Sequence, residues 1–227
     1  MPSNWNKGLT KDTNASVRKI SETMKLKKLD NFKIWRDKMQ FDYPPLIENG
    51  DLAELIGVSL GDGHICIYPR SEELRIISNS NNPGFIKRYA KIIEKVFDKR
   101  AYVIPSQHSN CTKIGVYQKH ISDRLGIPSG ARRYSNIKVP AWILKNRKYI
   151  VRYLRGLYEA EGCLCLHKPT YTHKFIFKNH NESMLKNVYR LVKRLGFHPH
   201  QSKYMIQVSK KDEVAKLSRL LEFRKYR

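Results

Sequence analysis

Two acidic residues in similar sequence contexts are the strongest candidates for chemistry in this chain. Residues 55–63 read LIGVSLGDG and residues 154–162 read LRGLYEAEG, so that Asp62 and Glu161 each precede a glycine. Both segments run from apolar to small residues, then to an acid, and both lead into a run typical of a β-strand. Two carboxylates brought together would repel each other unless a divalent cation lay between them.

The spacing of small residues predicts how these acids would meet. Each segment is expected to form a helix that ends at the glycine after its acid. Gly57 and Gly61 lie one turn apart in the first segment, as do Gly156 and Ala160 in the second. Such a stripe of small residues allows two helix backbones to approach closely. If the helices pack along these stripes, the two acids emerge side by side at a shared end.

The segments also begin two similar halves. Each half is expected to contain a helix, two strands, a helix, two strands and a short helix, which is an α+β pattern with antiparallel hairpins. When the halves are overlaid, Asn79 corresponds to Asn179 and Asn81 corresponds to Asn181. The expected division is an N-terminal extension (1–43), a first half (44–128), a basic connector (129–141) and a second half (142–227). Pro44-Pro45 separates the extension from the first half.

Strand alternation predicts which side chains face the core after each acid. In the first half we expect Ile65 and Ile67 to point inward. In the second half we expect the same of Leu164 and Leu166. The remaining side chains would form an open sheet surface beside the acids: His64, Cys66, Tyr68, Cys163, Cys165 and His167.

The paired segments resemble the motifs of LAGLIDADG homing endonucleases of the single-chain, two-motif kind. The second copy fits that pattern closely, and the first keeps its Asp-Gly ending. The resemblance implies two pseudo-symmetric halves with saddle-like antiparallel sheets. It also implies a monomeric, intron-encoded nuclease that cuts both strands of a long, asymmetric double-stranded DNA site.

The same resemblance assigns roles to residues. Asp62 and Glu161 would be catalytic and would bind metal with the backbone carbonyls of Gly61 and Ala160, holding two or three Mg²⁺ ions. The family often has a basic residue after the closing helix of each half, where it stabilises phosphate. Here these positions correspond to Arg132 or Arg133 in the first half and to Arg224 or Lys225 in the second.

Charge predicts a polyanionic partner. The 227 residues contain 44 Lys and Arg against 20 Asp and Glu, a net charge of +24, which favours nucleic acid. Arg, Asn and Gln can read base edges, whereas Lys mainly neutralises phosphate. We expect DNA contacts from Lys7, Arg18, Lys19, His64, Tyr68, Arg70, Arg75, Asn79, Lys113, Gln118, Lys119, Lys138, His167, Lys168, His173, Lys178, Lys203 and Gln207.

The N-terminal extension carries ten of the basic residues. Asn14 or Ser16 could cap a helix in which Val17, Ile20 and Met24 recur at helical spacing, and a second periodic set follows at Leu29, Phe32, Trp35 and Met39. Residues 5–10 are weakly similar to small DNA-binding modules attached to intron-encoded nucleases. We therefore expect helices that bind DNA. The alternative is a basic arm that docks on the main domain.

Other classes of protein fit less well. No apolar run approaches the ~20 residues of a membrane-spanning helix, and no signal peptide is evident. Four cysteines without a C-x-x-C pair indicate reduced thiols in an intracellular compartment, such as cytoplasm, nucleoid or organelle matrix, and no secretion. The alternative on the same fold is a non-cutting protein, either an intron RNA maturase with host intron RNA as partner or a DNA-binding regulator.

Overall fold

The computed structural model describes residues 6–27 and 43–226 and divides the chain into two units, Met1–Pro44 and Pro45–Arg227. In the first unit, α1 (Ala15–Leu26) begins after Asn14, whose side chain accepts hydrogen bonds from the backbone N–H groups of Ser16 and Val17. The predicted cap and the first predicted helix of the extension are therefore confirmed. The second periodic set (29–39) and Trp5 lie outside the described residues.

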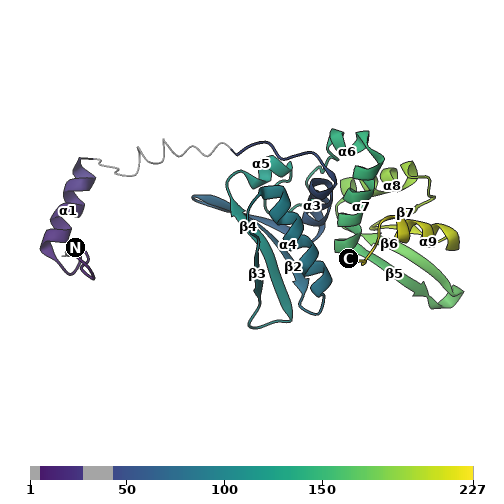
Figure 1. The fold of residues 1–227 in the computed structure, drawn as a ribbon, viewed down its shortest axis with the longest axis horizontal. Coiled ribbons are helices and arrows are strands. Elements are labelled where there is room, and N and C mark those ends of the chain that lie inside the picture. The colour runs from purple at the N-terminus through teal and green to yellow at the C-terminus, as the bar shows by residue number, and fades with distance from the viewer. Residues whose placement is uncertain (1–5, 28–42, 227) are drawn as a thin grey trace. The chain divides into compact units, whose positions relative to one another are not determined.

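The second unit contains both predicted halves (Figure 1). The first half consists of α3 (Gly50–Gly61), β1 (Gly63–Tyr68), β2 (Ser71–Asn79), α4 (Pro83–Phe97), β3 (Tyr102–Pro105), β4 (Cys111–Gln118) and α5 (Ile121–Leu125). The second half consists of α7 (Arg147–Glu161), β5 (Gly162–His167), the 3₁₀ turn η1 (Lys168–Thr170), β6 (Thr172–Lys178), α8 (Glu182–Arg194), β7 (His200–Ser202), β8 (Met205–Val208) and α9 (Lys211–Leu220). The predicted order of elements is confirmed in both halves.

One helix that we did not predict, α6 (Ala141–Lys145), begins at the end of the connector and lies mostly in the second half. Asn146 follows it and caps α7 by accepting a hydrogen bond from the backbone N–H of Lys148. Asn49 caps α3 in the same way through the N–H of Leu52. Both motif helices therefore begin at an asparagine that satisfies a free N–H group.

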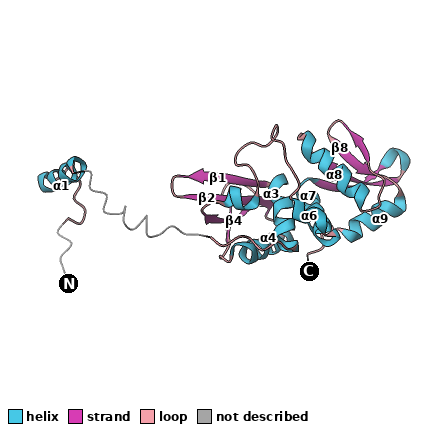
Figure 2. Ribbon diagram, turned by 90° about the horizontal axis from the view of Figure 1, so that it is seen from above, coloured by secondary structure: helices cyan, strands magenta, loops and turns pink. Residues whose placement is uncertain are grey.

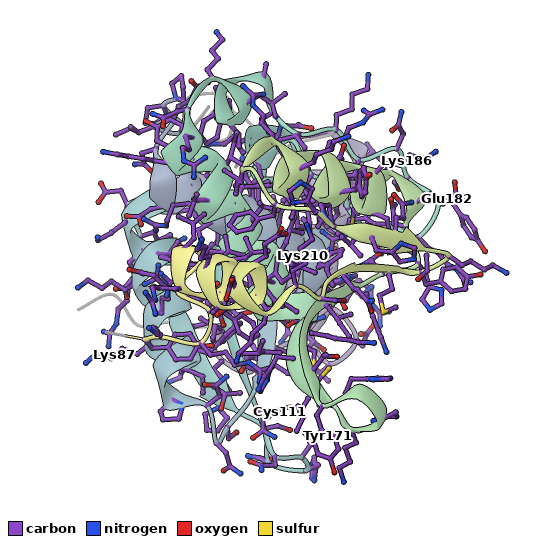
Figure 3. All side chains as sticks on the ribbon, turned by 90° about the vertical axis from the view of Figure 1, so that its right-hand side faces the viewer. Lys87, Cys111, Tyr171, Glu182, Lys186 and Lys210 are labelled. Carbon is purple, nitrogen blue, oxygen red and sulfur yellow. The ribbon has the colours of Figure 1, made fainter. Side chains whose placement is uncertain are left out.

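The two sheets repeat one topology. The strand order is β1-β2-β4-β3 in the first sheet and β5-β6-β8-β7 in the second, and every pairing is antiparallel. Figures 1 and 2 show α3 and α7 together at the centre with one sheet to either side. Figure 3 views the second half from outside, with Lys186 of α8 and Lys210 at the surface. None of the described helices is long and apolar enough to span a membrane.

One face of each sheet is covered by helices. Leu74 and Ile76 of β2 are buried with Tyr89 of α4, and Phe175 and Phe177 of β6 are buried with residues of α8. Because side chains alternate along a strand, the residues between them lie on the opposite, open face. This placement fixes which side chains the two sheets present to a ligand.

Three predicted core residues are exposed. Ile67, Leu164 and Leu166 have the register of helix-covered positions, but Ile67 is 65% exposed and both leucines are also exposed. β1 and β5 are edge strands, and the β1–β2 hairpin projects beyond the helices (Figure 2). The expectation that these residues are buried was therefore wrong, because the strands continue past the helices that cover their beginnings.

Candidate active site

The motif helices contact each other through their glycines. A Cβ added to Gly57 would lie 2.2 Å from the carbonyl oxygen of Tyr153 on α7. A Cβ added to Gly156 would lie 2.2 Å from the carbonyl oxygen of Glu54 on α3. No side chain fits at these distances, so the predicted backbone contact along the small-residue stripe is confirmed.

The same contact brings the two acids together. A Cβ added to Gly61 would lie 2.4 Å from Cβ of Ala160 and 3.1 Å from Cγ of Glu161. Asp62 follows directly as the C-cap of α3, and Glu161 is the last residue of α7. The acids therefore lie at adjoining helix ends, as the sequence predicts.

The electrostatics of the pair follow from this placement. Asp62 keeps accessible surface, but the surrounding protein removes enough water from its carboxylate to raise its pKa, and the charge of Glu161 adds to the effect, giving a pKa of about 7. Burial also raises the pKa of Glu161, against the hydrogen bond from Asn179 Nδ2 to Glu161 Oε1 (3.2 Å) and the nearby imidazole of His180. A positive charge placed beside the two carboxylates would therefore stabilise their ionised forms.

The site fits a divalent cation. The C-terminal ends of two helices, which carry partial negative charge, meet beside two carboxylates. Among the described residues, no cluster of three or more His, Cys, Asp or Glu could hold a metal ion. Magnesium commonly binds through one or two carboxylates and completes its shell with water and substrate phosphates. Two acids with nearby backbone carbonyls suit that pattern.

A basic pocket of about 860 Å³ adjoins Glu161. Its lining includes Arg133, Lys178 and Lys203, three cations that the sequence analysis assigned to DNA or phosphate. Asn179 and His180 also line it, and the ring of His180 packs at a tilt against that of Tyr204, with centroids 4.6 Å apart. Asn179 and His180 are not among the predicted site residues. The repeat pairing of Asn179 with Asn79 is the signal that could have found the first.

The basic residues expected to stabilise phosphate occupy different environments. Arg132 donates to the backbone carbonyls of Ser59 (2.8 Å) and Gly63, so it ties the connector to the end of α3. Arg133 is exposed, and its guanidinium lies 5.5 Å from the ring centroid of Tyr134. Arg133 is therefore the freer of the two to meet a phosphate group.

The C-terminal candidates are attached to α7 by their backbone. The N–H of Arg224 donates to Glu159 (2.6 Å), and the carbonyl of Lys225 accepts from Arg155 (2.7 Å). These bonds fix the main chain after α9 and leave the side chain of Lys225 exposed.

Most predicted DNA contacts lie on the open faces or in their turns. On the first sheet, the register places His64, Tyr68, Arg75, Asn79 and Lys113 on the open face. On the second, it places His167, Lys178 and Gln207 there. The exposed residues Arg70, Lys119, Lys168 and Lys203 lie in turns at strand ends, and Lys7, Arg18 and Lys19 belong to the first unit.

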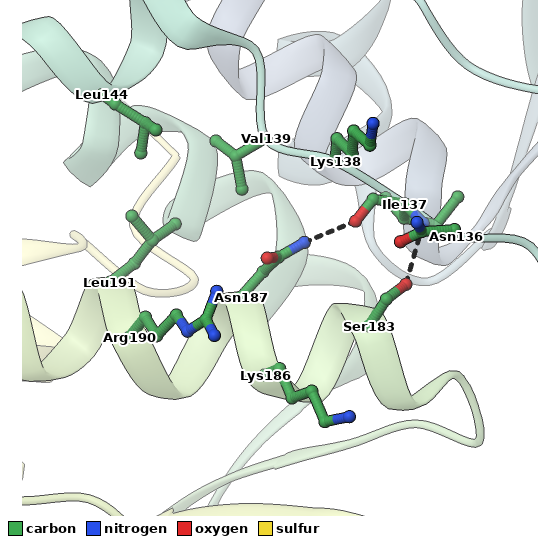
Figure 4. Close-up of a pocket in the computed structure, with 10 residues that line it drawn as sticks. All are labelled: Asn136, Ile137, Lys138, Val139, Leu144, Ser183, Lys186, Asn187, Arg190 and Leu191. Carbon is green, nitrogen blue, oxygen red and sulfur yellow. Dashed lines mark hydrogen bonds between the residues drawn. The ribbon is translucent and has the colours of Figure 1, made fainter.

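Three predicted contacts lie elsewhere. Gln118 is 8% exposed on the helix-covered face and accepts a hydrogen bond from Arg124, and His173 has the register of the buried Phe175. Lys138 lies in the connector beside α8, where Asn187 donates to the carbonyl of Ile137 (2.7 Å) (Figure 4). Helix α8 covers the other face of its sheet. Gln118 and His173 therefore do not lie on the open faces, and the contacts of all three residues with DNA stay predictions.

Several residues of the open faces were missed. Lys174 lies between Phe175 and His173 and faces the open side with Lys178, while Tyr102, Tyr117 and Ile77 do so on the first sheet. Alternation from the two buried phenylalanines of β6 identifies Lys174 directly.

Comparison with curated proteins gives partial matches only. The chain is 27% identical over 135 residues to glutamine–fructose-6-phosphate aminotransferase of Methanocaldococcus jannaschii and 26% identical over 137 residues to the tRNA-splicing ligase RtcB of Pyrococcus furiosus. The matches cover 57% and 53% of this chain but 12% and 14% of those proteins. No family model matches the chain. Because the matches cover so little of two proteins with different activities, neither activity can be assigned to this chain.

Comparison with solved structures identifies the fold. Mesophilic variants of the homing endonuclease I-DmoI match with a TM-score of 0.52 at 17% identity, over 76% of this chain and 94% of theirs. I-DmoI in complex with DNA and Mn matches with the same TM-score and identity over 76% and 96%. The N-terminal LAGLIDADG domain of DUF199/WhiA matches with a TM-score of 0.50 at 12% identity, over 80% and 84%. The chain therefore has the LAGLIDADG fold, as the motifs predict.

Proposed function

We propose, from the LAGLIDADG fold that this chain adopts, that it is a site-specific endonuclease. Its substrate would be a long, asymmetric double-stranded DNA site, in which it hydrolyses one phosphodiester of each strand with a divalent cation. The observation that carries the proposal is the meeting of Asp62 and Glu161 at adjoining helix ends between two open sheets. Asp62 and Glu161 come from the two halves of one chain, which supports a monomer that needs no partner subunit to complete its site.

In this proposal the two carboxylates hold the cation. Mg²⁺, as two or three ions, would bind Asp62, Glu161 and the backbone carbonyls of Gly61 and Ala160, which lie at the contact between the helices. When bound, a divalent cation lowers the pKa of a water nucleophile and neutralises charge on the phosphate. Asn179 orients the Glu161 carboxylate through its hydrogen bond.

Basic side chains near the acids would position the phosphates. Arg133, Lys178 and Lys203 line the pocket beside Glu161, where their charges can neutralise the DNA backbone. Lys225, after the closing helix of the second half, would neutralise phosphate in the same way. The open-face residues of both sheets then lie along the DNA on either side of the cleavage point. An origin in an intron is part of the same proposal.

A cleavage selection tests the proposal directly. A library of long randomised duplexes is incubated with the protein and Mg²⁺, and cut molecules are sequenced. We expect one recovered site cut in both strands, with no cutting when a chelator replaces the cation. Recovery of random ends, or cutting that is equally fast with Asp62→Asn, would overturn the assignment.

A second function on this fold is supported by the likeness to the WhiA domain, which is described as a LAGLIDADG domain and not as a nuclease. A DNA-binding regulator or an intron RNA maturase would bind its nucleic acid without cleavage and without dependence on the two acids. The same protein preparation distinguishes these cases when binding to duplex DNA and to structured RNA is measured beside cleavage.

A further inference from the structure

The two open sheet faces differ in chemistry. The second carries the charged or polar residues His167, Lys174, Lys178 and Gln207, and its apolar Ile176 and Met205 are half-buried. The first carries an aromatic patch, which we define as Tyr68 and Tyr117, and nearer the acids it carries Ile77 and Ile104 on either side of Lys113. Both patch residues are exposed, Tyr68 by 44% and Tyr117 by 46%, and so are the two isoleucines. The two sheets thus share one topology but present different side chains on their open faces.

A buried carboxylate fixes the rings of the first sheet. Glu73 lies among them, only 3% exposed, and accepts hydrogen bonds from the hydroxyls of Tyr68 (3.0 Å) and Tyr102 (2.5 Å). The hydrogen bond to Glu73 raises the pKa of Tyr68 to about 12, so its ring stays neutral. Arg75 balances the charge of Glu73 from 4.0 Å.

The neighbouring contacts complete a rigid surface. The ring of Tyr117 lies 5.5 Å from that of Tyr102 and 6.2 Å from that of Tyr68, measured between centroids. Tyr102 lies across Gly115, where an added Cβ would come within 2.5 Å of the Tyr102 hydroxyl. Because the hydroxyls of Tyr68 and Tyr102 already donate to Glu73, these rings offer mainly carbon surface to a ligand.

We propose that the aromatic patch contacts thymine methyl groups in the major groove of the half-site that lies over the first sheet. This inference rests on the proposed function and adds the recognition chemistry of one half-site. The thymine C5-methyl is the apolar feature that the major groove displays, and apolar side chains contact it directly. The surface of the second sheet instead suits hydrogen-bond acceptors and phosphates.

The strand register places the contacts along the DNA. Tyr117 of β4 lies in one cross-strand row with Glu73 of β2 and Cys66 of β1. Cys66 is four residues after Asp62, and Tyr68, which lies in the row of its partner Ser71, is six residues after Asp62. At ~3.3 Å per strand residue these rows lie roughly 13 and 20 Å from the acids. With about 3.4 Å between base pairs, the thymines are expected about four to six base pairs from the cleavage centre.

Deoxyuridine provides the probe, because it keeps the pairing of thymine and lacks only the methyl group. Thymines of the selected duplex are replaced one at a time, and dissociation constants are measured in Ca²⁺ with the full-length protein. In a variant whose other three cysteines are replaced by serine, a crosslinker on the exposed thiol of Cys163, on the open face of the second sheet, marks the half-site that this sheet contacts. We expect losses of up to about fourfold per thymine in the other half-site and no change in the marked one.

Matched variants assign the effect to the patch. Tyr117→Ala should abolish the difference between thymine and deoxyuridine, whereas Tyr117→Phe should retain it because the ring remains. Lys174→Ala, on the second sheet, should weaken binding of both duplexes equally. Melting temperatures of all three variants show whether the fold is kept.

The outcomes separate this inference from the proposed function. The inference alone would be overturned if deoxyuridine weakened binding equally in both half-sites of the selected duplex. It would also be overturned if deoxyuridine left the dissociation constant unchanged in the half-site over the first sheet. Unchanged discrimination in a folded Tyr117→Ala variant would do the same. The absence of any selected duplex would overturn the proposed function.

Discussion

At the residue scale, replacing the two acids should separate DNA binding from DNA cleavage. Asp62→Asn and Glu161→Gln each remove one carboxylate of the pair while keeping its shape. We expect the cleavage rate to fall at least about 100-fold, because charge stabilisation by a held cation is worth several kcal/mol. Affinity measured by titration should stay within a few-fold or tighten, because a negative charge beside the phosphates is removed. Glu182→Gln, at the surface of α8, is the matched control and should cut normally.

The raised pKa of Asp62 predicts a pH-dependent stability of the metal-free protein. Its carboxyl binds its proton more tightly in the folded chain, with a pKa of about 7, than in the unfolded chain, where water surrounds it and its pKa is the ordinary 3.8. Its contribution to the free energy of unfolding is therefore complete below about pH 4 and is lost as the pH rises through about 7.

Urea unfolding in a chelator at pH 5 and pH 8 measures this contribution. The parent protein should lose more stability over this interval than Asp62→Asn, in which the amide cannot titrate. Mg²⁺ should restore stability to the parent protein at pH 8 more than to the variant. Identical pH profiles of the two proteins would contradict the raised pKa.

At the element scale, the close approach of α3 and α7 predicts which glycines are indispensable. Gly57→Ala places a Cβ against the carbonyl of Tyr153, so the helices must separate. We expect a loss of about 1–3 kcal/mol in the free energy of unfolding, as for other overpacked contacts, together with a loss of cleavage beyond that of folding. Gly50→Ala on the same helix meets only the side chain of Arg152 and should be tolerated. Equal effects of the two substitutions would place the small-residue stripe outside the interface.

The connector offers a second test, because its two arginines have different tasks. Arg132→Ala removes the donors to the carbonyls of Ser59 and Gly63 and should lower the melting temperature. Arg133→Ala should leave the melting temperature unchanged and weaken binding to DNA, with a shallower salt dependence. Thermal unfolding and salt titration of both variants decide the assignment. A reversed pattern would return the phosphate contact to Arg132.

The elements show what sequence could and could not predict. The order of helices and strands follows from periodicity and caps, and the meeting of the acids follows from glycine spacing, because both signals are local. The exposure of Leu164 and Leu166 could not be predicted, because it depends on where the covering helices end. The contacts of Arg132 with Ser59 and Gly63 join residues far apart in the chain, which no local pattern contains.

At the scale of the whole molecule, a buried ion network joins the halves. Glu54 of α3 is fully buried and accepts hydrogen bonds from Arg88 of α4 (2.6 Å) and from Arg152 of α7 (2.5 Å). Arg152 also donates to Asp51 at the start of α3 (2.5 Å). The network connects the N-terminal halves of the motif helices, while the acids lie at their C-terminal ends. The helix pair is thereby fixed at both ends, which helps to hold the spacing of the acids.

The division of the chain into units leads to the last prediction. Residues 1–43 carry ten basic and five acidic residues, and α1 buries none of its residues. We predict that this extension lengthens the contact with DNA, mainly through phosphates. A truncated chain of residues 45–227 keeps every element of both halves, so it should fold and cut the same phosphodiesters at saturating protein. Its affinity should fall, and its salt slope should decrease by about 0.9 for each phosphate that the extension no longer neutralises.

The competing role for the extension is structural support of the second unit, and two measurements separate the roles. Under the structural role, the truncated chain would melt earlier than the full chain. Replacing Lys7, Arg18 and Lys19 with glutamine in the full chain would then leave affinity unchanged. Under the DNA-binding role, the melting transition of the second unit is unchanged by truncation, and the three substitutions reproduce part of the loss in affinity and salt slope. Because the substitutions remove charge without removing α1, a change in salt slope at a constant melting temperature can come only from phosphates that these side chains no longer neutralise.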